Sequence, residues 1–335
     1  MSERITWRSR VVSGFALAAL VLAACAPAAA PTQAPVDSVE PTAAPSGDKP
    51  VIKLAENNWT GSRINISVAK LLLEQALGYT VELVTIDENQ QWAALAAGDL
   101  SASLEVWPSG HAENVAKYID EQKTVVNAGA LGVEGQIGWF IPTYMLTDHP
   151  ELATWEGFQD PANAALFKTA ETGEAGQFLG GDPSWVQYDE QIITNLGLNL
   201  KVVYAGSEEA ILAQLDSVYS RQDPILMYFY RPHSAFARYD LTKVELPANS
   251  AECYAKAEQG GVDCDYPTDG LFKIAWSGLA AAAPDAYQLI SSLNYSTEDQ
   301  IGMIAAVDTD GKTPEEAAQA WIDAHPDVWK AWVGQ

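Results

Sequence analysis

The sequence of 335 residues has little positive charge. Its 19 Lys and Arg residues are outnumbered by 44 Asp and Glu residues, which gives a formal net charge of -25 at pH 7. This balance excludes an ordinary nucleic-acid-binding protein, because such proteins present a basic surface to phosphates. We therefore expect no nucleic-acid partner.

Recognisable enzyme motifs are also missing. The sequence has no Gly-x-Ser-x-Gly elbow, no His-Glu-x-x-His pair, no phosphate loop and no dinucleotide fingerprint. We expect neither catalysis nor a cofactor, and the alternative is an anchored hydrolase or lyase without these motifs.

The N-terminus resembles a bacterial export signal. Three arginines lie in its first ten residues, Val11–Ala24 is apolar, and the run ends at Leu22-Ala-Ala-Cys25. The apolar run is too short for a membrane-spanning helix. We predict a lipoprotein signal peptide at residues 1–24 and lipidation of Cys25. An ordinary cleaved signal with an unrelated cysteine is the alternative.

A tether is predicted for residues 25–50, where Pro and Ala dominate and no charge precedes Asp37. Such a segment buries too little surface to fold and acts as a spacer. The folded body then begins near Val51. Without the leader (one Glu and three Arg, net +2), the charge changes from -25 to -27, which suits a soluble body outside the cell.

Cysteine is scarce, with three residues in the chain. Besides Cys25 there are Cys253 and Cys264, separated by ten residues in a chain predicted to be exported. We predict a disulfide between them. A metal pair is the alternative, although none of the four histidines lies close to either cysteine in sequence, and we predict no metal site.

Strands and helices alternate through the first part of the body, which predicts parallel βαβ units. The predicted strands are Val51–Ala55, Tyr79–Ile86 and Ser101–Val106. The predicted helices are Arg63–Leu77, Gln91–Ala97 and a segment from Ser109 toward Tyr118.

A second α/β unit is predicted after a crossing at Gly132–Ile141. Its predicted elements are a strand at Phe167–Ala170, a flexible segment at Glu171–Gly181, a helix opened by Asp182-Pro183 and running to Leu196, a strand at Lys201–Tyr204, a helix at Ser207–Arg221 and a strand at Pro224–Tyr230. A return strand at Leu271–Ala275 precedes helices at Asp285–Leu293, Thr297–Ala306, from Thr313 with a capping box, and at Val328–Val333. We predict two lobes, residues 51–135 with 274–335 and residues 136–273.

Large aromatics follow several predicted strands, where open α/β sheets bind ligands. Trp107 follows a strand that Pro108 ends, and Trp59 lies in the loop after the first strand. Trp185 and Tyr230 occupy similar positions in the second lobe. Each also has a packing alternative: a strand–helix corner for Trp107, a helix anchor for Trp185 and a buried strand end for Tyr230.

Aromatic faces around a cleft suit a quaternary ammonium group, which has no hydrogen to donate. Trp107, Trp185 and Tyr230 would together contribute about 6 kcal/mol at best, against about 8 kcal/mol for micromolar binding. Another contact is needed. The amides of Val186 and Gln187, in the first turn of the predicted helix, favour a carboxylate.

Several motifs in one order resemble the glycine betaine/proline betaine substrate-binding proteins of ABC importers. They are Trp107-Pro-Ser-Gly-His111, Gly181-Asp-Pro-Ser-Trp185, Tyr228-Phe-Tyr-Arg-Pro-His233, Phe236-Ala-Arg-Tyr-Asp240 and Ala320-Trp-Ile-Asp-Ala-His325, and the likeness covers Val51 to Trp332. The resemblance implies a two-lobed type II periplasmic binding-protein fold with the ligand between the lobes. It implies an aromatic cage of Trp107, Trp185 and Tyr230, and carboxylate contacts from Val186, Gln187 and His111.

The same resemblance implies a receptor that delivers its ligand to an ABC permease and its ATPase. With the predicted lipidation of Cys25 we expect it to be anchored to the membrane, and we expect a monomer. The chain departs from the family pattern in having Tyr230 where Trp is frequent, and in lacking the cysteines that bracket the Trp185 position in some relatives. Asp182, as a helix cap, would occupy one of the same amides and repel an anion, and Glu105 would also favour a cation. Choline, carnitine or another betaine, and a sensory lipoprotein without a transporter, are therefore alternatives to glycine betaine uptake.

Overall fold

The computed structural model describes residues 49–334. The predicted signal peptide, Cys25 and nearly all of the tether lie outside the described residues. Within 49–334, none of the helices combines the length and the apolar composition needed to cross a membrane.

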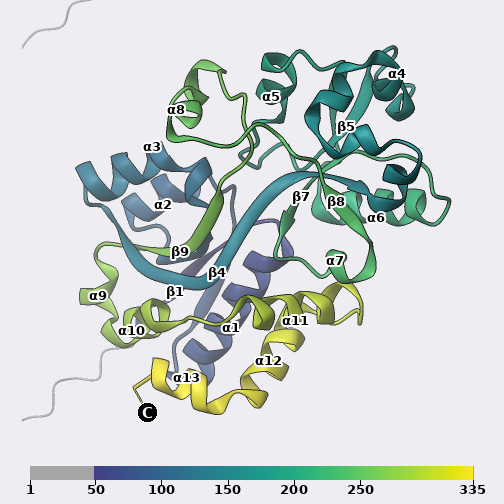
Figure 1. Cartoon of the computed structure of the whole chain (residues 1–335). Coiled ribbons are helices and arrows are strands. Elements are labelled where there is room, and N and C mark those ends of the chain that lie inside the picture. The colour runs from purple at the N-terminus through teal and green to yellow at the C-terminus, as the bar shows by residue number, and fades with distance from the viewer. Residues whose placement is uncertain (1–48, 335) are drawn as a thin grey trace, which may run out of the picture. The chain divides into compact units, whose positions relative to one another are not determined.

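Nine strands form one mixed sheet in the order β2-β1-β3-β9-β4-β7-β5-β6, with β8 paired to β4 (Figure 1). At one end β1 pairs parallel with β2 and β3, and at the other β5 pairs parallel with β6 and β7. The strands are β1 Ile52–Glu56, β2 Val81–Thr85, β3 Ala102–Val106, β4 Val125–Pro142, β5 Gly176–Gly180, β6 Leu200–Tyr204, β7 Met227–Arg231, β8 Leu241–Lys243 and β9 Thr268–Trp276. The expected α/β fold with parallel units is confirmed.

The long strand β4 joins the two parallel ends of the sheet. It pairs antiparallel with β9 from Val125 to Gln136 and with β7 from Gln136 to Phe140. The predicted lobe boundary at 135/136 coincides with this change of partner, whereas the one at 273/274 lies inside β9. These lobe boundaries stay a prediction.

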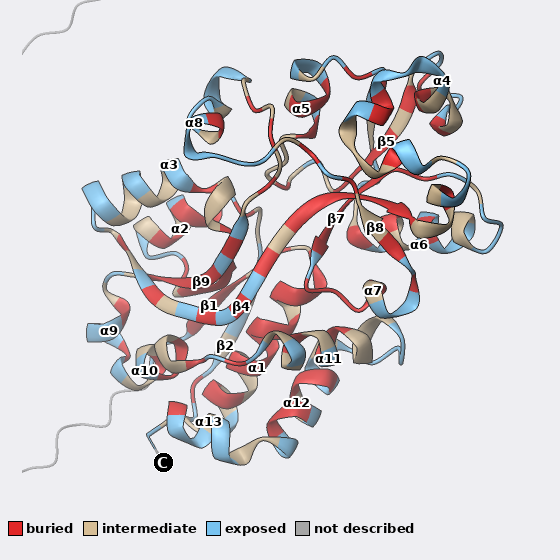
Figure 2. Ribbon diagram, viewed as in Figure 1, coloured by how far each residue is buried: buried red, intermediate tan, exposed pale blue. Residues whose placement is uncertain are grey.

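Helices cover both ends of the sheet (Figure 1). Around the β1–β3 end, α1 buries Ile64, Val68 and Leu72 and contacts α11 and α12. The lower half of the molecule accordingly has a red, buried interior in Figure 2. The helices are α1 Thr60–Gln75, α2 Gln91–Ala97, α3 Ala112–Asn114, α4 Pro161–Ala164, α5 Asp189–Asn195, α6 Glu208–Tyr219, α7 Ala235–Arg238, α8 Ala251–Tyr254, α9 Leu279–Ala282, α10 Pro284–Ser292, α11 Thr297–Asp308, α12 Pro314–Ala324 and α13 Pro326–Trp332.

Helix signals in the sequence hold at several places. Helix α2 has the predicted bounds Gln91–Ala97. Thr313 caps α12 through the predicted capping box, with Pro314 in its first turn. Ser207 caps α6 by accepting a hydrogen bond from the amide of Ala210.

The predicted strand at Phe167–Ala170 is wrong. Residues 165–167 form a 3-10 turn, and the strand is β5, inside the segment expected to be flexible. Its glycines permit close packing: a Cβ atom on Gly176 would lie 2.3 Å from the carbonyl oxygen of Ala164, and one on Gly180 2.9 Å from the Tyr204 ring.

The predicted helix from Asp182 is also wrong, because α5 begins only at Asp189. Asp182 caps a turn, where its Oδ1 accepts from the amide of Ser184 at 2.8 Å. The side chain of Gln187 then accepts from the Gly181 amide at 2.8 Å and donates to the Asp182 carbonyl at 2.7 Å. These local bonds hold residues 181–187 in a closed loop in place of a helix.

The segment after Trp107 is helical but irregular. A 3-10 turn at Pro108–Gly110 is followed by α3 and by a π-helical stretch at Val115–Glu121. His111 lies at the junction of the turn and α3.

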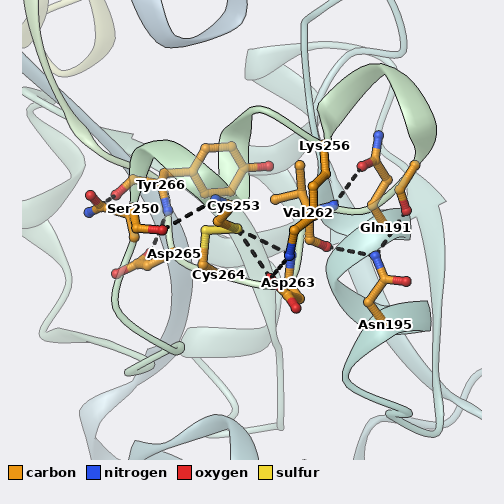
Figure 3. The surroundings of a disulfide bond; sticks show 12 residues. Gln191, Asn195, Ser250, Cys253, Lys256, Val262, Asp263, Cys264, Asp265 and Tyr266 are labelled. Carbon is orange, nitrogen blue, oxygen red and sulfur yellow. Dashed lines mark hydrogen bonds and ion pairs between the residues drawn. A yellow bond between two sulfur atoms is a disulfide. The ribbon is translucent and has the colours of Figure 1, made fainter.

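Cys253 in α8 and Cys264 form a disulfide with their Cα atoms 6.5 Å apart (Figure 3). The loop that it closes is fastened to α5, since Val262 donates to Gln191 at 3.0 Å and Asn195 donates to the Val262 carbonyl at 2.9 Å. Directly after the loop, the hydroxyl of Tyr266 accepts from the amide of Tyr188 at 2.8 Å. The disulfide loop thus borders the segment that carries Trp185.

Candidate ligand-binding site

A cavity of about 30 Å³ lies where the ends of β3, β5 and β7 meet. Most of its lining is aromatic: Trp59, Trp107, Trp185, Tyr188, Tyr228, Tyr230 and Tyr266. The remaining lining residues are Glu88, Ser109, Gly110, Ile137 and Val186.

Four of these rings follow one another at right angles. The centroids of Trp107 and Tyr230 are 5.7 Å apart at 81°, those of Tyr230 and Trp185 are 6.3 Å apart at 85°, and those of Trp185 and Trp59 are 6.3 Å apart at 90°. The structure thus places the three predicted cage residues and Trp59 around one cavity. We call these four side chains the aromatic box.

Glycines make room for two of the rings. A Cβ atom on Gly135 of β4 would lie 2.4 Å from the ring of Trp107, and one on Gly181 would lie 2.6 Å from the ring of Trp185. Trp107 therefore packs closely against β4 and is only 9% exposed.

Glu105 fixes the two tryptophans of the β1–β3 end. Its Oε1 accepts from Trp59 Nε1 at 2.7 Å and from Trp107 Nε1 at 3.0 Å. Its Oε2 accepts from Asn65 at 2.6 Å and from Gln300 at 3.0 Å. Burial raises the pKa of Glu105 to about 7, although the hydrogen bonds from Trp59, Trp107 and Gln300 oppose that rise. Glu105 lies behind the rings, outside the cavity lining.

The other two rings, Trp185 and Tyr230, are connected by hydrogen bonds to residues that follow β1 at the other end of the sheet. Trp185 Nε1 donates to Asn58 Oδ1 at 2.6 Å. The hydroxyl of Tyr230 donates to Glu208, which also accepts from the hydroxyl of Thr60 at 2.5 Å. Burial, and then the charge of Glu208 and its hydrogen bond, raise the pKa of Tyr230 well above its usual range, so the phenol stays neutral.

Glu88 occupies the place that the resemblance gave to a ligand carboxylate. Its Oε1 accepts from the amide of Val186 at 2.6 Å, and its Oε2 lies 3.1 Å from His111 Nε2. His111 is only 1% exposed and is outside the cavity lining.

The expectation that Asp182 takes one of the predicted carboxylate contacts is wrong. Its carboxylate bonds the Ser184 amide and Asn58 Nδ2, the latter at 2.9 Å. The side chain of Gln187 is engaged by the backbone of the same loop, and neither residue lines the cavity.

Sequence reasoning missed several lining residues, two of which had a signal. Glu88 lies two residues beyond the end of a predicted strand, and residues beyond strand ends are where open α/β sheets bind ligands, which is why Trp107 was chosen. Tyr228 shares a face of β7 with Tyr230, since side chains two apart point the same way. Tyr188 and Tyr266 had no comparable signal.

Comparisons with known proteins agree with this architecture. Residues 50–324 match the family described as the substrate binding domain of ABC-type glycine betaine transport systems. The chain is 26% identical over 289 residues to a trimethylamine N-oxide-binding protein of Pelagibacter ubique, covering 84% of this chain and 90% of that relative. A glycine betaine/carnitine transport binding protein of Listeria monocytogenes is 29% identical over 127 residues, 38% of this chain and 37% of the relative.

Solved structures share the fold. A lactococcal protein of this family in a closed complex with glycine betaine has a TM-score of 0.67 at 21% identity, covering 85% of this chain and all (100%) of that one. A choline-binding protein in complex with choline has a TM-score of 0.68 at 19% identity, covering 85% and 91% of the two chains. The family match spans most of the described body, and the chain therefore belongs to the family of substrate-binding domains of ABC-type glycine betaine transport systems.

Proposed function

We propose that this protein binds a small compound with a trimethylammonium group in the aromatic box and delivers it to an ABC permease and its ATPase. The observation that carries the proposal is the box itself, four rings around one cavity in which each successive pair meets at nearly a right angle. Methyl groups of an ammonium ion pack against ring faces, and the positive charge is attracted to their π electrons.

The energies are of the right size. At about 0.5–2 kcal/mol for each desolvated ring, four rings contribute about 2–8 kcal/mol, close to the 8 kcal/mol of micromolar binding at the upper end. Glu105 adds negative charge behind two of the rings. Relatives are named for binding trimethylamine N-oxide, choline or glycine betaine, and these compounds carry a trimethylammonium group or a close analogue of it.

We further propose that the lobes, residues 51–135 with 274–335 and residues 136–273, close over the ligand by a hinge in β4 and β9. Closure brings Trp59 and Trp107 of one lobe against Trp185 and Tyr230 of the other. The receptor works outside the cytoplasm as a monomer, with Cys25 as its lipid anchor.

Calorimetric titration of the unlipidated chain from residue 26 onward tests the proposal. Choline is compared with 3,3-dimethylbutan-1-ol, which has the same shape without the charge, and with trimethylamine N-oxide and glycine betaine. We expect at least one trimethylammonium compound to bind at micromolar concentration or below, and the neutral analogue to bind at least tenfold more weakly than choline. Equal binding of choline and its neutral analogue would contradict a cation site.

A further inference from the structure

Glu88 brings a carboxylate to the edge of the aromatic box. It lies in the loop between β2 and α2, lines the cavity, and is only 8% exposed. Its two oxygens contact different lobes, since Val186 lies between β5 and α5 whereas His111 follows β3.

Both contacts are hydrogen bonds from groups that could otherwise hold a ligand. The Val186 amide donates to Oε1 at 2.6 Å. Asn114 Nδ2 lies 3.3 Å from His111 Nδ1, an arrangement in which Nδ1 accepts and Nε2 donates to Oε2 of Glu88, 3.1 Å away. Two of the three groups that the family resemblance assigned to a ligand carboxylate, the Val186 amide and His111, are thus bonded to a carboxylate of the protein.

A ligand carboxylate would meet two obstacles at this place. The amide of Val186 and the imidazole of His111 each have a single hydrogen directed at this site, and Glu88 already accepts both. A second carboxylate would also approach a like charge in a largely buried setting, which is unfavourable. A hydroxyl group meets neither obstacle, because it can donate to Glu88.

Resting on the proposed function, we propose that Glu88 is a specificity residue that replaces the ligand carboxylate with an internal one. The site then takes trimethylammonium compounds without a carboxylate, such as choline, in preference to glycine betaine. Glu88 also supplies the bond between lobes that a ligand carboxylate would otherwise make.

The test is titration of the wild-type chain and the variants Glu88→Gln and Glu88→Ala with tetramethylammonium, choline and glycine betaine. In the wild type we expect choline to bind at least tenfold more tightly than glycine betaine. Removing the charge in Glu88→Gln is expected to shift the glycine betaine to tetramethylammonium affinity ratio at least tenfold toward glycine betaine. Glu88→Ala, which also frees both donors, is expected to shift it further.

Asp87→Asn is the matched control, because it removes a negative charge from the neighbouring residue, and the Asn oxygen can still accept from the Asn89 amide as Asp87 does. It is expected to leave the affinity ratio within about twofold. Thermal unfolding of each variant shows whether it folds, and the wild-type ranking tests the proposal without any variant.

The outcomes separate the two proposals. Wild-type binding of glycine betaine as tight as that of choline, with a ratio that Glu88→Gln leaves unchanged, would overturn the role of Glu88 and leave the aromatic box intact. Failure of tetramethylammonium, choline, glycine betaine and trimethylamine N-oxide alike to bind the wild type would overturn the proposed function, and the role of Glu88 with it.

Discussion

The two walls of the aromatic box are held in different ways. Trp59 and Trp107, the first wall, both donate to Glu105, which also accepts from Asn65 and Gln300 of helices α1 and α11 at the same β1–β3 end of the sheet. Trp185 and Tyr230, the second wall, lie at the β5–β7 end and depend on bonds to the β1–β3 end: Trp185 donates directly to Asn58, and Tyr230 reaches Thr60 through Glu208. The first wall is therefore built within one end of the sheet, and the second is completed by contact between the two ends.

The two glutamates behind the walls show what a charged neighbour does to a buried carboxylate. Both are almost fully buried, at 2% and 1% exposure for Glu105 and Glu208. Burial raises the pKa of Glu105 to about 7, since its partners are neutral donors. Burial acts on Glu208 too, but the hydrogen bond and charge of His233, with bonds from Thr60 and Tyr230, outweigh it and lower the pKa of Glu208.

Removing a ring from either wall should have the largest effect on binding. Trp107→Ala and Trp185→Ala each lose a cation–π contact and the packing of an indole, about 2 kcal/mol or more, which corresponds to at least tenfold weaker binding of the preferred ligand. Calorimetry of both variants checks this. If only one variant loses affinity, the ligand uses one wall alone and the box is misassigned.

Substitution of two asparagines, one beside each wall, tests the two walls separately. Asn65→Ala removes a donor to buried Glu105 and should lower the free energy of unfolding of the ligand-free protein by about 1–3 kcal/mol. Asn58→Ala removes the bonds that Asn58 makes with Trp185 and with Asp182, at a position only partly buried. It should leave ligand-free stability almost unchanged and weaken binding about tenfold.

Thermal unfolding with and without a saturating ligand measures both effects. The Asn58 variant should show a reduced ligand-induced rise in Tm, and the Asn65 variant a lower Tm in both conditions. The reverse pattern would contradict the division into a preformed wall and a wall completed by closure.

The first wall was easier to predict from sequence than the second. Trp107 follows a regular strand, and the rule that ligands lie beyond strand ends needs only the strand to be located. Trp185 was also found, but on a helix that does not exist, because Asp182-Pro183 fits a turn as well as a helix start. Side-chain bonds from Gln187 to the backbone at 181 and 182 decide between the two, and no local pattern encodes them.

The segment at 171–181 was the other source of error. It was predicted to be flexible, yet it contains β5, which Gly176 and Gly180 allow to pack closely on its neighbours. Glu88 was missed because its contacts, Val186 and His111, lie far from it in sequence. Local signals thus located the elements and the rings, whereas contacts between distant segments determined the polar part of the site.

The smallest expected effect on binding is electrostatic and comes from Glu105. The carboxyl group of Glu105 releases its proton near its ordinary pKa of 4.5 in the unfolded chain, whereas burial raises its pKa to about 7 in the folded chain. Between these values the folded state binds more protons, so raising the pH lowers the free energy of unfolding, by about 3 kcal/mol at most. Burial also raises the pKa of Asp189 to about 7, which makes stability fall with pH in the same direction. The wild-type profile must therefore be compared with that of Glu105→Gln, and not with a stability independent of pH.

Ionisation of Glu105 has the opposite effect on binding. Its negative charge attracts a cation that lies in the box on the other side of Trp59 and Trp107, so affinity rises as stability falls. From pH 5.5 to 8.5 the wild type should lose stability while its affinity for choline or tetramethylammonium rises about threefold, as expected for a charge behind a ring in a partly screened site. Glu105→Gln should show a shallower stability profile and an affinity independent of pH. Denaturant unfolding and calorimetry at both pH values measure the two trends. If stability and affinity change with pH in Glu105→Gln as they do in the wild type, a group other than Glu105 titrates. Glu105 of the wild type would then hold the first wall as a carboxylate that is charged across the whole pH range.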